Sequence, residues 1–461
     1  MPPSSSRFAA GALLLSCSVS LAALLPAPAR ASDLSDALQH AIHKKAHTEK
    51  APAEPPSREQ IAQTWDAFLT SVVKRAGSDS RQSEVRSELL GVLLEERYEL
   101  VSLLTDFTID APALLASLFE SSWQQLVPLL DRVAAELPPE TASKYRSFVE
   151  AGDMLRAAER LGVARDLASS PESLRKLARI LVGDGGRDPL AYDTEVDPDL
   201  REIFGFGPPL PPPAPSPLLG PASEGPSGAW LFLPRAPLAW LGGFAAGVGD
   251  WLVPAASAAP APEKKALVAR LNTWVPSKTS ELREYVPMVR DMLSMTADEA
   301  MARARVGTDH AQVYRNLVLA TAWQESCWRQ FVMRQGEILP LTNSSGSFGL
   351  MQINAKVWRG IYSLGGILGD IGYNGRAGSE ILQHYLNDLA LRSGEHLAPG
   401  GEDNLARATY AAYNGGPGHL RRYRKPDTSP ELQTVDEGFW ERYQAVKAGD
   451  ERSFLRCSNP G

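Results

Sequence analysis

A glutamate on an apolar helix face is the first residue in this sequence whose setting suggests chemistry. The segment LATAWQESCWR, residues 319–329, contains Glu325, and helical steps back from it reach Ala322, Val318 and Tyr314. Residues at this spacing share one face of a helix, so we expect the carboxyl group to lie among apolar neighbours. Burial disfavours the charged form of a carboxyl group and raises its pKa. Glu325 is therefore a candidate general acid near neutral pH.

Two further segments combine polar residues with turn signals. NSSGSFGLMQIN, residues 343–354, is expected to be a Ser/Gly turn that leads into a new apolar helix, with Gly349 allowing close backbone approach. NLARATYAAYNGGPG, residues 404–418, is expected to be a helix that stops at its Asn-Gly-Gly-Pro sequence. Tyr410 and Tyr413 lie on one side of that helix.

The three segments together resemble the catalytic domain of soluble lytic transglycosylases. The pair Glu325-Ser326, the run Gly-Leu-Met-Gln at 349–352 and Ala-Tyr-Asn-x-Gly at 412–416 occur in that family's order and approximate spacing. The segment YNGRAGSEILQHYLNDL, residues 373–389, is similar to the family's helix between the second and third motifs. The resemblance covers roughly residues 300–430.

The resemblance implies a lysozyme-like, goose-type helical domain that cleaves peptidoglycan glycan strands. The bond would be the one between N-acetylmuramic acid and N-acetylglucosamine, and the product would end in a 1,6-anhydro ring. The glutamate of the Glu-Ser motif is the essential carboxylate in that family, and Glu325 is the matching position. The resemblance also implies a set of residues that support this acid or line the sugar groove: Ser326, Gly349, Met351, Gln352, Tyr413 and Asn414.

Each supporting position has a functional and a simpler interpretation. Ser326 would position the acid, and Tyr413 would reach it by a hydrogen bond. Met351 and Gln352 would line the groove, but Met351 also fits the core and Gln352 also fits a bond to backbone. Asn414 would shape the turn or bind sugar, or it would only cap the helix.

Two other functions stay open at this point. A hydrolytic muramidase of the same fold would need a second carboxylate, and Glu337 and Asp370 are the nearest candidates in sequence, although surface or loop roles suit them better. A non-catalytic wall-binding scaffold would need no acid in an apolar pocket. Motifs for metal or phosphate binding are missing, so we expect no metal and no cofactor.

The elements that must position these residues indicate a mostly α protein. Residues 58–206 show leucines at helical spacing and almost no strand signals, which predicts a helical N-terminal domain. Residues 263–461 are expected to form the lysozyme-like transglycosylase domain, with its motif core at 312–425. The N-terminal helices are a candidate site for a protein partner.

Residues 207–262 are expected to be a proline-rich and apolar linker between the two helical parts. Its segment 229–253 is apolar but interrupted by proline, arginine and aspartate, which favours packing or membrane contact over a span of about 20 apolar residues.

The first residues predict export. Residues 1–31 read as a secretory signal peptide with cleavage after Ala31, and residues 32–57 as a flexible tether. A lipoprotein signal at Cys17 is the less favoured alternative. Export implies a periplasmic or cell-envelope location and leaves Cys327 and Cys457, which would pair in an oxidising compartment or remain two thiols.

Charge limits the partners. The chain carries a net charge of −7, with 22% charged and 44% hydrophobic residues, which argues against nucleic acid as a target. The basic stretch HLRRYRK, residues 419–425, is interpreted as solvated surface, with binding of anionic peptide stems as the alternative.

Overall fold

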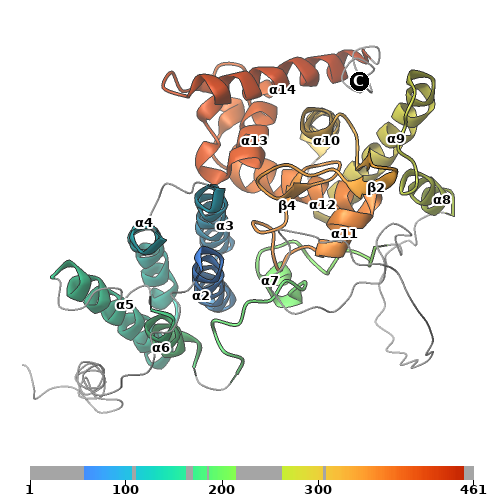
Figure 1. Cartoon of the computed structure of the whole chain (residues 1–461). Coiled ribbons are helices and arrows are strands. Elements are labelled where there is room, and N and C mark those ends of the chain that lie inside the picture. The colour runs from blue at the N-terminus through green and yellow to red at the C-terminus, as the bar shows by residue number, and fades with distance from the viewer. Residues whose placement is uncertain are drawn as a thin grey trace, which may run out of the picture. The chain divides into compact units, whose positions relative to one another are not determined.

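The structure is a computed structural model. It describes residues 57–105, 111–161, 170–183, 186–213, 262–304 and 308–450, all of which belong to one compact unit. The N-terminal described part consists of helices, namely α2 (Arg58–Asp79), α3 (Ser83–Thr105), α4 (Ala111–Ala135), α5 (Pro139–Arg160), α6 (Pro171–Val182) and α7 (Pro198–Ile203) (Figure 1).

The C-terminal part adds further helices and two short hairpins. Its main helices are α8 (Pro262–Leu271), α9 (Thr279–Ala304), α10 (Ala311–Ser326), α11 (Leu364–Gly369), α12 (Ile371–His384), α13 (Asp403–Gly415) and α14 (Pro430–Ala448). A π-helical turn, Tyr385–Leu391, continues α12. Helices predominate in the described residues, which confirms the predicted mostly α fold.

An aromatic cluster forms the core of the N-terminal helices. Trp65 of α2 contacts Phe119 of α4 at 5.6 Å between ring centroids, and Phe119 stacks on Trp123 at 5.3 Å. Gly152 of α5 makes room for the Trp123 ring, because a Cβ there would lie 2.1 Å from it. Such large buried rings contribute strongly to helix packing.

Helix α12 is the buried centre of the C-terminal part. It packs between α9 and α10, and its Ser379 joins both: the hydroxyl lies 3.2 Å from that of Thr296, and its carbonyl accepts from Tyr314 at 2.6 Å. Gly378 permits close approach of Met351, because a Cβ there would lie 2.5 Å from the Met351 side chain. The chemistry-bearing segments are thus held around one buried helix.

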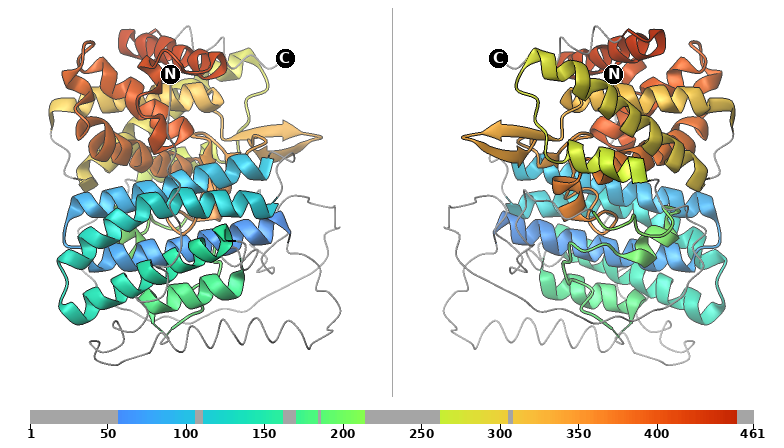
Figure 2. Two further views of the ribbon diagram at one scale, coloured as in Figure 1. Left: turned by 90° about the vertical axis from the view of Figure 1, so that its left-hand side faces the viewer. Right: turned by 90° about the vertical axis from the view of Figure 1, so that its right-hand side faces the viewer.

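Two short antiparallel hairpins follow α10. Strands β1 (Phe331–Arg334) and β2 (Glu337–Pro340) form one that extends away from the helices in Figure 2, and β3 (Ser347–Phe348) and β4 (Ile353–Asn354) form the other. The prediction that a helix begins within residues 343–354 is therefore wrong. The Asn343 side chain accepts from the amides of Ser345 and Ser347, which turns the chain into β3 instead.

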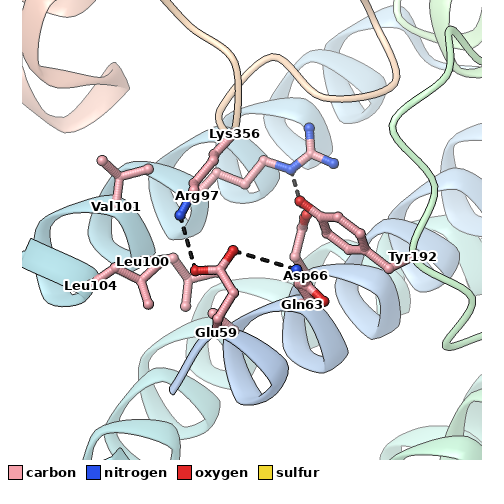
Figure 3. Close-up of a pocket in the computed structure, with 10 residues that line it drawn as sticks. Glu59, Gln63, Asp66, Arg97, Leu100, Val101, Leu104, Tyr192 and Lys356 are labelled. Carbon is pink, nitrogen blue, oxygen red and sulfur yellow. Dashed lines mark hydrogen bonds and ion pairs between the residues drawn. The ribbon is translucent and has the colours of Figure 1, made fainter. Parts of the chain in front are cut away.

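A buried ion cluster joins the N-terminal helices to the C-terminal part. Asp66 of α2 bonds Arg97 of α3 at 2.7 Å and Arg359 at 2.6 Å. Figure 3 shows the small pocket beside it, in which Lys356 pairs with Glu59 at 3.1 Å. The charged groups of this pocket are paired with one another, so we assign it a structural role.

A second buried ion pair joins the same two parts of the chain. Arg201 of α7 is fully buried, bonds the Glu380 carboxylate of α12 at 3.0 Å and donates to the Ile361 carbonyl at 3.0 Å. Removing either partner would leave an uncompensated buried charge, which is strongly destabilising. The Arg201–Glu380 pair therefore helps to fix α7 against α12.

Candidate active site

Glu325 lies in the last turn of α10. The helix ends at Cys327 in left-handed conformation, φ 52°, and Trp328 follows with φ 59°. Two consecutive non-glycine residues with left-handed backbone angles are unusual and carry conformational strain, which proteins tend to hold at functional sites. The buried Trp328 indole fixes the turn by donating to the Leu319 carbonyl at 3.0 Å.

The environment of Glu325 suits a general acid. The residue is half-buried, and burial raises its pKa to about 7, opposed by hydrogen bonds from Tyr410 and Asn414 and by the charge of Arg422. The Tyr410 hydroxyl donates to Glu325 Oε1 at 2.9 Å. A carboxyl group with this pKa is partly protonated at neutral pH and can both give and take a proton.

The tyrosine expected to reach the acid was Tyr413, and that expectation is wrong. Tyr410 makes this contact, whereas the Tyr413 hydroxyl donates to the Met351 carbonyl at 2.6 Å. Both tyrosines are buried in α13, about one turn apart, and the earlier of the two in the chain is the partner of Glu325. Tyr413 instead supports the 349–352 segment.

A residue of helix α14 fixes the orientation of the Tyr410 ring. The rings of Phe439 and Tyr410 stack in parallel, with centroids 4.0 Å apart and planes inclined by 3°. Phe439 in turn contacts Tyr443 at 6.0 Å between ring centroids. The orientation of the tyrosine that bonds the acid therefore depends on a helix that the motifs do not include.

A chain of charged and polar side chains leads from α14 toward Glu325. Arg422 is buried, pairs with Asp436 of α14 at 2.7 Å and donates to Asn414 Oδ1 at 2.9 Å. The Asn414 side chain in turn favours the ionised form of Glu325 and lowers the pKa of that carboxyl group. Asp436 and Asn414 thus connect through Arg422, and the positive charge lies close enough to the acid to lower its pKa.

The interpretation of residues 419–425 as solvated surface is corrected accordingly. Arg422 is a buried part of the site. Its neighbours Arg421 and Arg424 both bond the buried carboxylate of Glu395, at 2.9 and 2.8 Å. The stretch is basic because it neutralises Asp436 and Glu395 inside the fold.

Ser326 ties the acid-bearing helix to the second motif. Its hydroxyl lies 2.6 Å from the Leu350 carbonyl and 3.1 Å from that of Ala322. Two side chains that sequence reasoning missed complete the support: Gln330 accepts from the Leu350 amide, and Asn374 accepts from the Met351 amide, both at 2.8 Å. Asn374 lies in the segment 373–389 that resembles the family, but no role followed from that pattern, and no local pattern marked Gln330, because both side chains act over long sequence separations.

Gly349 is required by both its conformation and its surroundings. Its φ is +75°, and a Cβ would lie 2.3 Å from the Gln330 side chain. Met351 is fully buried, which fits the core interpretation, and Gln352 bonds the Gly349 carbonyl at 2.9 Å, which fits the backbone interpretation. Sugar contacts by these residues stay a prediction.

The two candidate second carboxylates have other positions. Asp370 is buried and caps α12, accepting from the amides of Gly372 and Tyr373 at 2.8 and 3.0 Å. Glu337 is exposed on β2. Neither arrangement resembles that of a second catalytic group.

The remaining expectations fall partly outside the described residues. Cys327 is disulfide-bonded, but Cys457 lies in the undescribed C-terminal segment, so their pairing stays a prediction. Residues 1–31, including Cys17, and the segment 229–253 are not described either. Among the helices that the structure describes, none is long and apolar enough to cross a membrane.

Comparison with known proteins adds one finding. Residues 304–434 match the family model described as Transglycosylase SLT domain. Comparison with curated proteins and with solved structures gave no match. The match confirms the resemblance carried by the three motifs. It contains Glu325, Tyr410 and Arg422, whereas Asp436 and Phe439 of α14 lie beyond it.

Proposed function

We propose that this protein cleaves the β-1,4 bond between N-acetylmuramic acid and N-acetylglucosamine. Its C-terminal part carries a transglycosylase SLT domain, which implies lytic transglycosylase-type activity on peptidoglycan. The product would carry a 1,6-anhydro-N-acetylmuramic acid end. Glu325 would serve as both acid and base. The observation that carries the proposal is the half-buried Glu325 carboxyl, with a pKa raised to about 7 and a tyrosine donor at 2.9 Å.

In the first step Glu325 acts as an acid. Its proton passes to the glycosidic oxygen, the bond from that oxygen to C1 of muramic acid breaks, and N-acetylglucosamine leaves with a free hydroxyl. Positive charge develops on the muramic acid ring as the bond breaks. The Glu325 carboxylate formed at the same time is stabilised by the Tyr410 hydroxyl and the Asn414 amide.

In the second step the same carboxylate acts as a base. It takes the proton of the muramic acid C6 hydroxyl as that oxygen bonds to C1, which closes the anhydro ring. Glu325 is then protonated again, and no water is consumed. A pKa near neutrality suits this double role, because neither protonation state is strongly disfavoured.

The positions of the other carboxylates favour this route over hydrolysis. A hydrolytic muramidase needs a second carboxylate that activates water or stabilises the intermediate. Asp370 is engaged as a helix cap, Asp436 is paired with Arg422, and Glu337 is exposed on a hairpin. Asp370 and Asp436 are thus held by other contacts, and Glu337 lies exposed outside the site.

We also propose that the protein works outside the cytoplasm, in the periplasm or cell envelope. Its proposed substrate is there, and residues 1–31 have the pattern of a signal peptide. The disulfide at Cys327 is consistent with an oxidising compartment.

The test is mass spectrometry of the soluble products after incubation of the mature protein with purified peptidoglycan. We expect anhydro-muropeptides from the native protein and from the Glu337→Gln control, and none from Glu325→Gln. Reducing-end products, and their loss in Glu337→Gln, would indicate a hydrolytic muramidase. A lack of products from the native protein would instead support a wall-binding scaffold.

A further inference from the structure

The end of α13 leaves two backbone groups that its own helix cannot satisfy. The carbonyl of Tyr413 would normally accept from the amide four residues later, but that residue is Pro417, which has no N–H. The amide of Gly418, just beyond, has no carbonyl partner within the loop. Buried or half-buried groups of this kind need partners from elsewhere.

Helix α3 supplies both partners, although it lies more than three hundred residues away in sequence. The Tyr98 hydroxyl donates to the Tyr413 carbonyl at 2.9 Å, and Glu95 Oε2 accepts from the Gly418 amide at 2.7 Å. Figure 1 shows α3 directly beside α13. The two contacts bracket residues 414–417, which end α13 and begin the 3-10 turn Pro417–His419. We call residues 414–418 the 414–418 loop.

The loop itself is shaped for this contact. Gly416 has φ +98°, and a Cβ there would lie 2.9 Å from the Tyr98 ring. A Cβ at Gly418 would lie 2.3 Å from the Glu95 carboxylate. The glycines let the backbone pass directly over the side chains of α3, so the fit belongs to both segments.

The position of α3 is fixed by the residue next to Tyr98. Arg97 is buried, pairs with Asp66 at 2.7 Å and donates to the carbonyls of Val357 and Arg359, both at 3.0 Å. Consecutive residues of α3 therefore hold two separate segments of the C-terminal part. Burial raises the pKa of Tyr98 to about 12, so its hydroxyl keeps its proton and remains a donor at neutral pH.

We propose that α3 positions the active site, and that Tyr98 and Glu95 are positioning residues that hold the 414–418 loop so that Asn414 lies beside Glu325. They act through the loop and touch no reacting atom. The helix lies outside the matched residues 304–434, so the N-terminal helices and the transglycosylase domain form one catalytic unit. This inference rests on the proposed function.

The experiment uses the mature chain and compares Tyr98→Phe, Glu95→Ala and their double variant with the native protein. Tyr145→Phe is the matched control, because it also removes a phenol hydrogen bond from the N-terminal helices, to Asp79 at 2.8 Å, without contacting the loop. Two quantities are measured: kcat and KM on soluble glycan strands, and hydrogen–deuterium exchange of peptides spanning residues 413–420.

We expect each single variant to lose about 2- to 10-fold in kcat at nearly constant KM, as the loss of one hydrogen bond implies. The double variant should lose more than either. Amide exchange at 413–420 should be faster in all three, while Tyr145→Phe behaves as the native protein. Glu95 is half-buried, so Glu95→Ala keeps the test available if Tyr98→Phe fails to fold.

Native kcat and native exchange in both single variants would overturn the inference. Equal losses in Tyr145→Phe would do so as well, because they would show general softening of the helices. An inactive native protein whose loop exchange still depends on Tyr98 would instead overturn the proposed function while leaving the loop contact in place.

Discussion

Tyr410→Phe should move the pH dependence of activity in a direction that the site geometry fixes. The change removes the hydroxyl that donates to Glu325 Oε1 at 2.9 Å and leaves the ring that stacks on Phe439 at 4.0 Å. That hydrogen bond favours the ionised carboxylate, so its loss must raise the pKa of Glu325. The protonated acid then persists to higher pH.

The size of this shift follows from the energy of one hydrogen bond. A bond to a charged group contributes about 1.5–3 kcal/mol, and 1.36 kcal/mol corresponds to about one pH unit, so the alkaline limb should move upward by about one to two units. In the native protein that limb is expected near the Glu325 pKa of about 7. The maximal rate should fall, because the carboxylate formed in the first step loses a donor.

The assay is the initial rate of soluble muropeptide release as a function of pH, with Glu325→Gln as the blank. Tyr443→Phe is the control, because Tyr443 belongs to the same aromatic cluster but its hydroxyl is not among the groups that bond Glu325. An unchanged limb, or a limb that moves to lower pH in a folded Tyr410→Phe protein, would refute this reasoning.

Three further predictions follow from the same contacts. Glu325→Gln should be more stable than the native protein above pH 7, by at most about 3 kcal/mol, and equally stable below pH 4.5. The reason is that the pKa of Glu325 is raised from 4.5 to about 7, so ionisation of this group destabilises the native fold between these two pH values. Urea unfolding of both proteins at pH 4 and pH 8 measures the difference. Asp436→Asn should move the alkaline limb to lower pH, opposite to Tyr410→Phe, because the positive charge of Arg422 is then uncompensated and lowers the pKa of Glu325 further. The same change should lower the free energy of unfolding by about 3–5 kcal/mol. Gly349→Ala should lower the melting temperature more than Gly346→Ala, because both have positive φ but only a Cβ at 349 meets the Gln330 side chain; equal effects would contradict the steric argument.

The sequence predicted what local patterns encode. The apolar face of α10 pointed to Glu325, leucine periodicity predicted the N-terminal helices, and the Asn-Gly-Gly-Pro sequence predicted the end of α13. These features depend on residues within one or two helical turns, where spacing alone determines which side chains share a face.

What the sequence could not predict depends on distant partners. The choice between Tyr410 and Tyr413 rests on how α13 is rotated against α10, which packing decides. Gln330 and Asn374 hold the second motif from separate segments, and nothing in the local sequence indicated that role. The β3–β4 hairpin replaced a predicted helix because the Asn343 side chain bonds the backbone of the turn. The contacts of α3 with the 414–418 loop likewise join segments far apart in the chain.

The most direct test of the central claim is the fate of water in the reaction. The mature protein is incubated with purified peptidoglycan in water labelled with heavy oxygen, and the new glycan ends are analysed by mass spectrometry. If Glu325 alone acts as acid and base, the muramic acid ends are anhydro and carry no label. Labelled reducing ends that disappear in Glu325→Gln would contradict the account and establish hydrolysis at the same site.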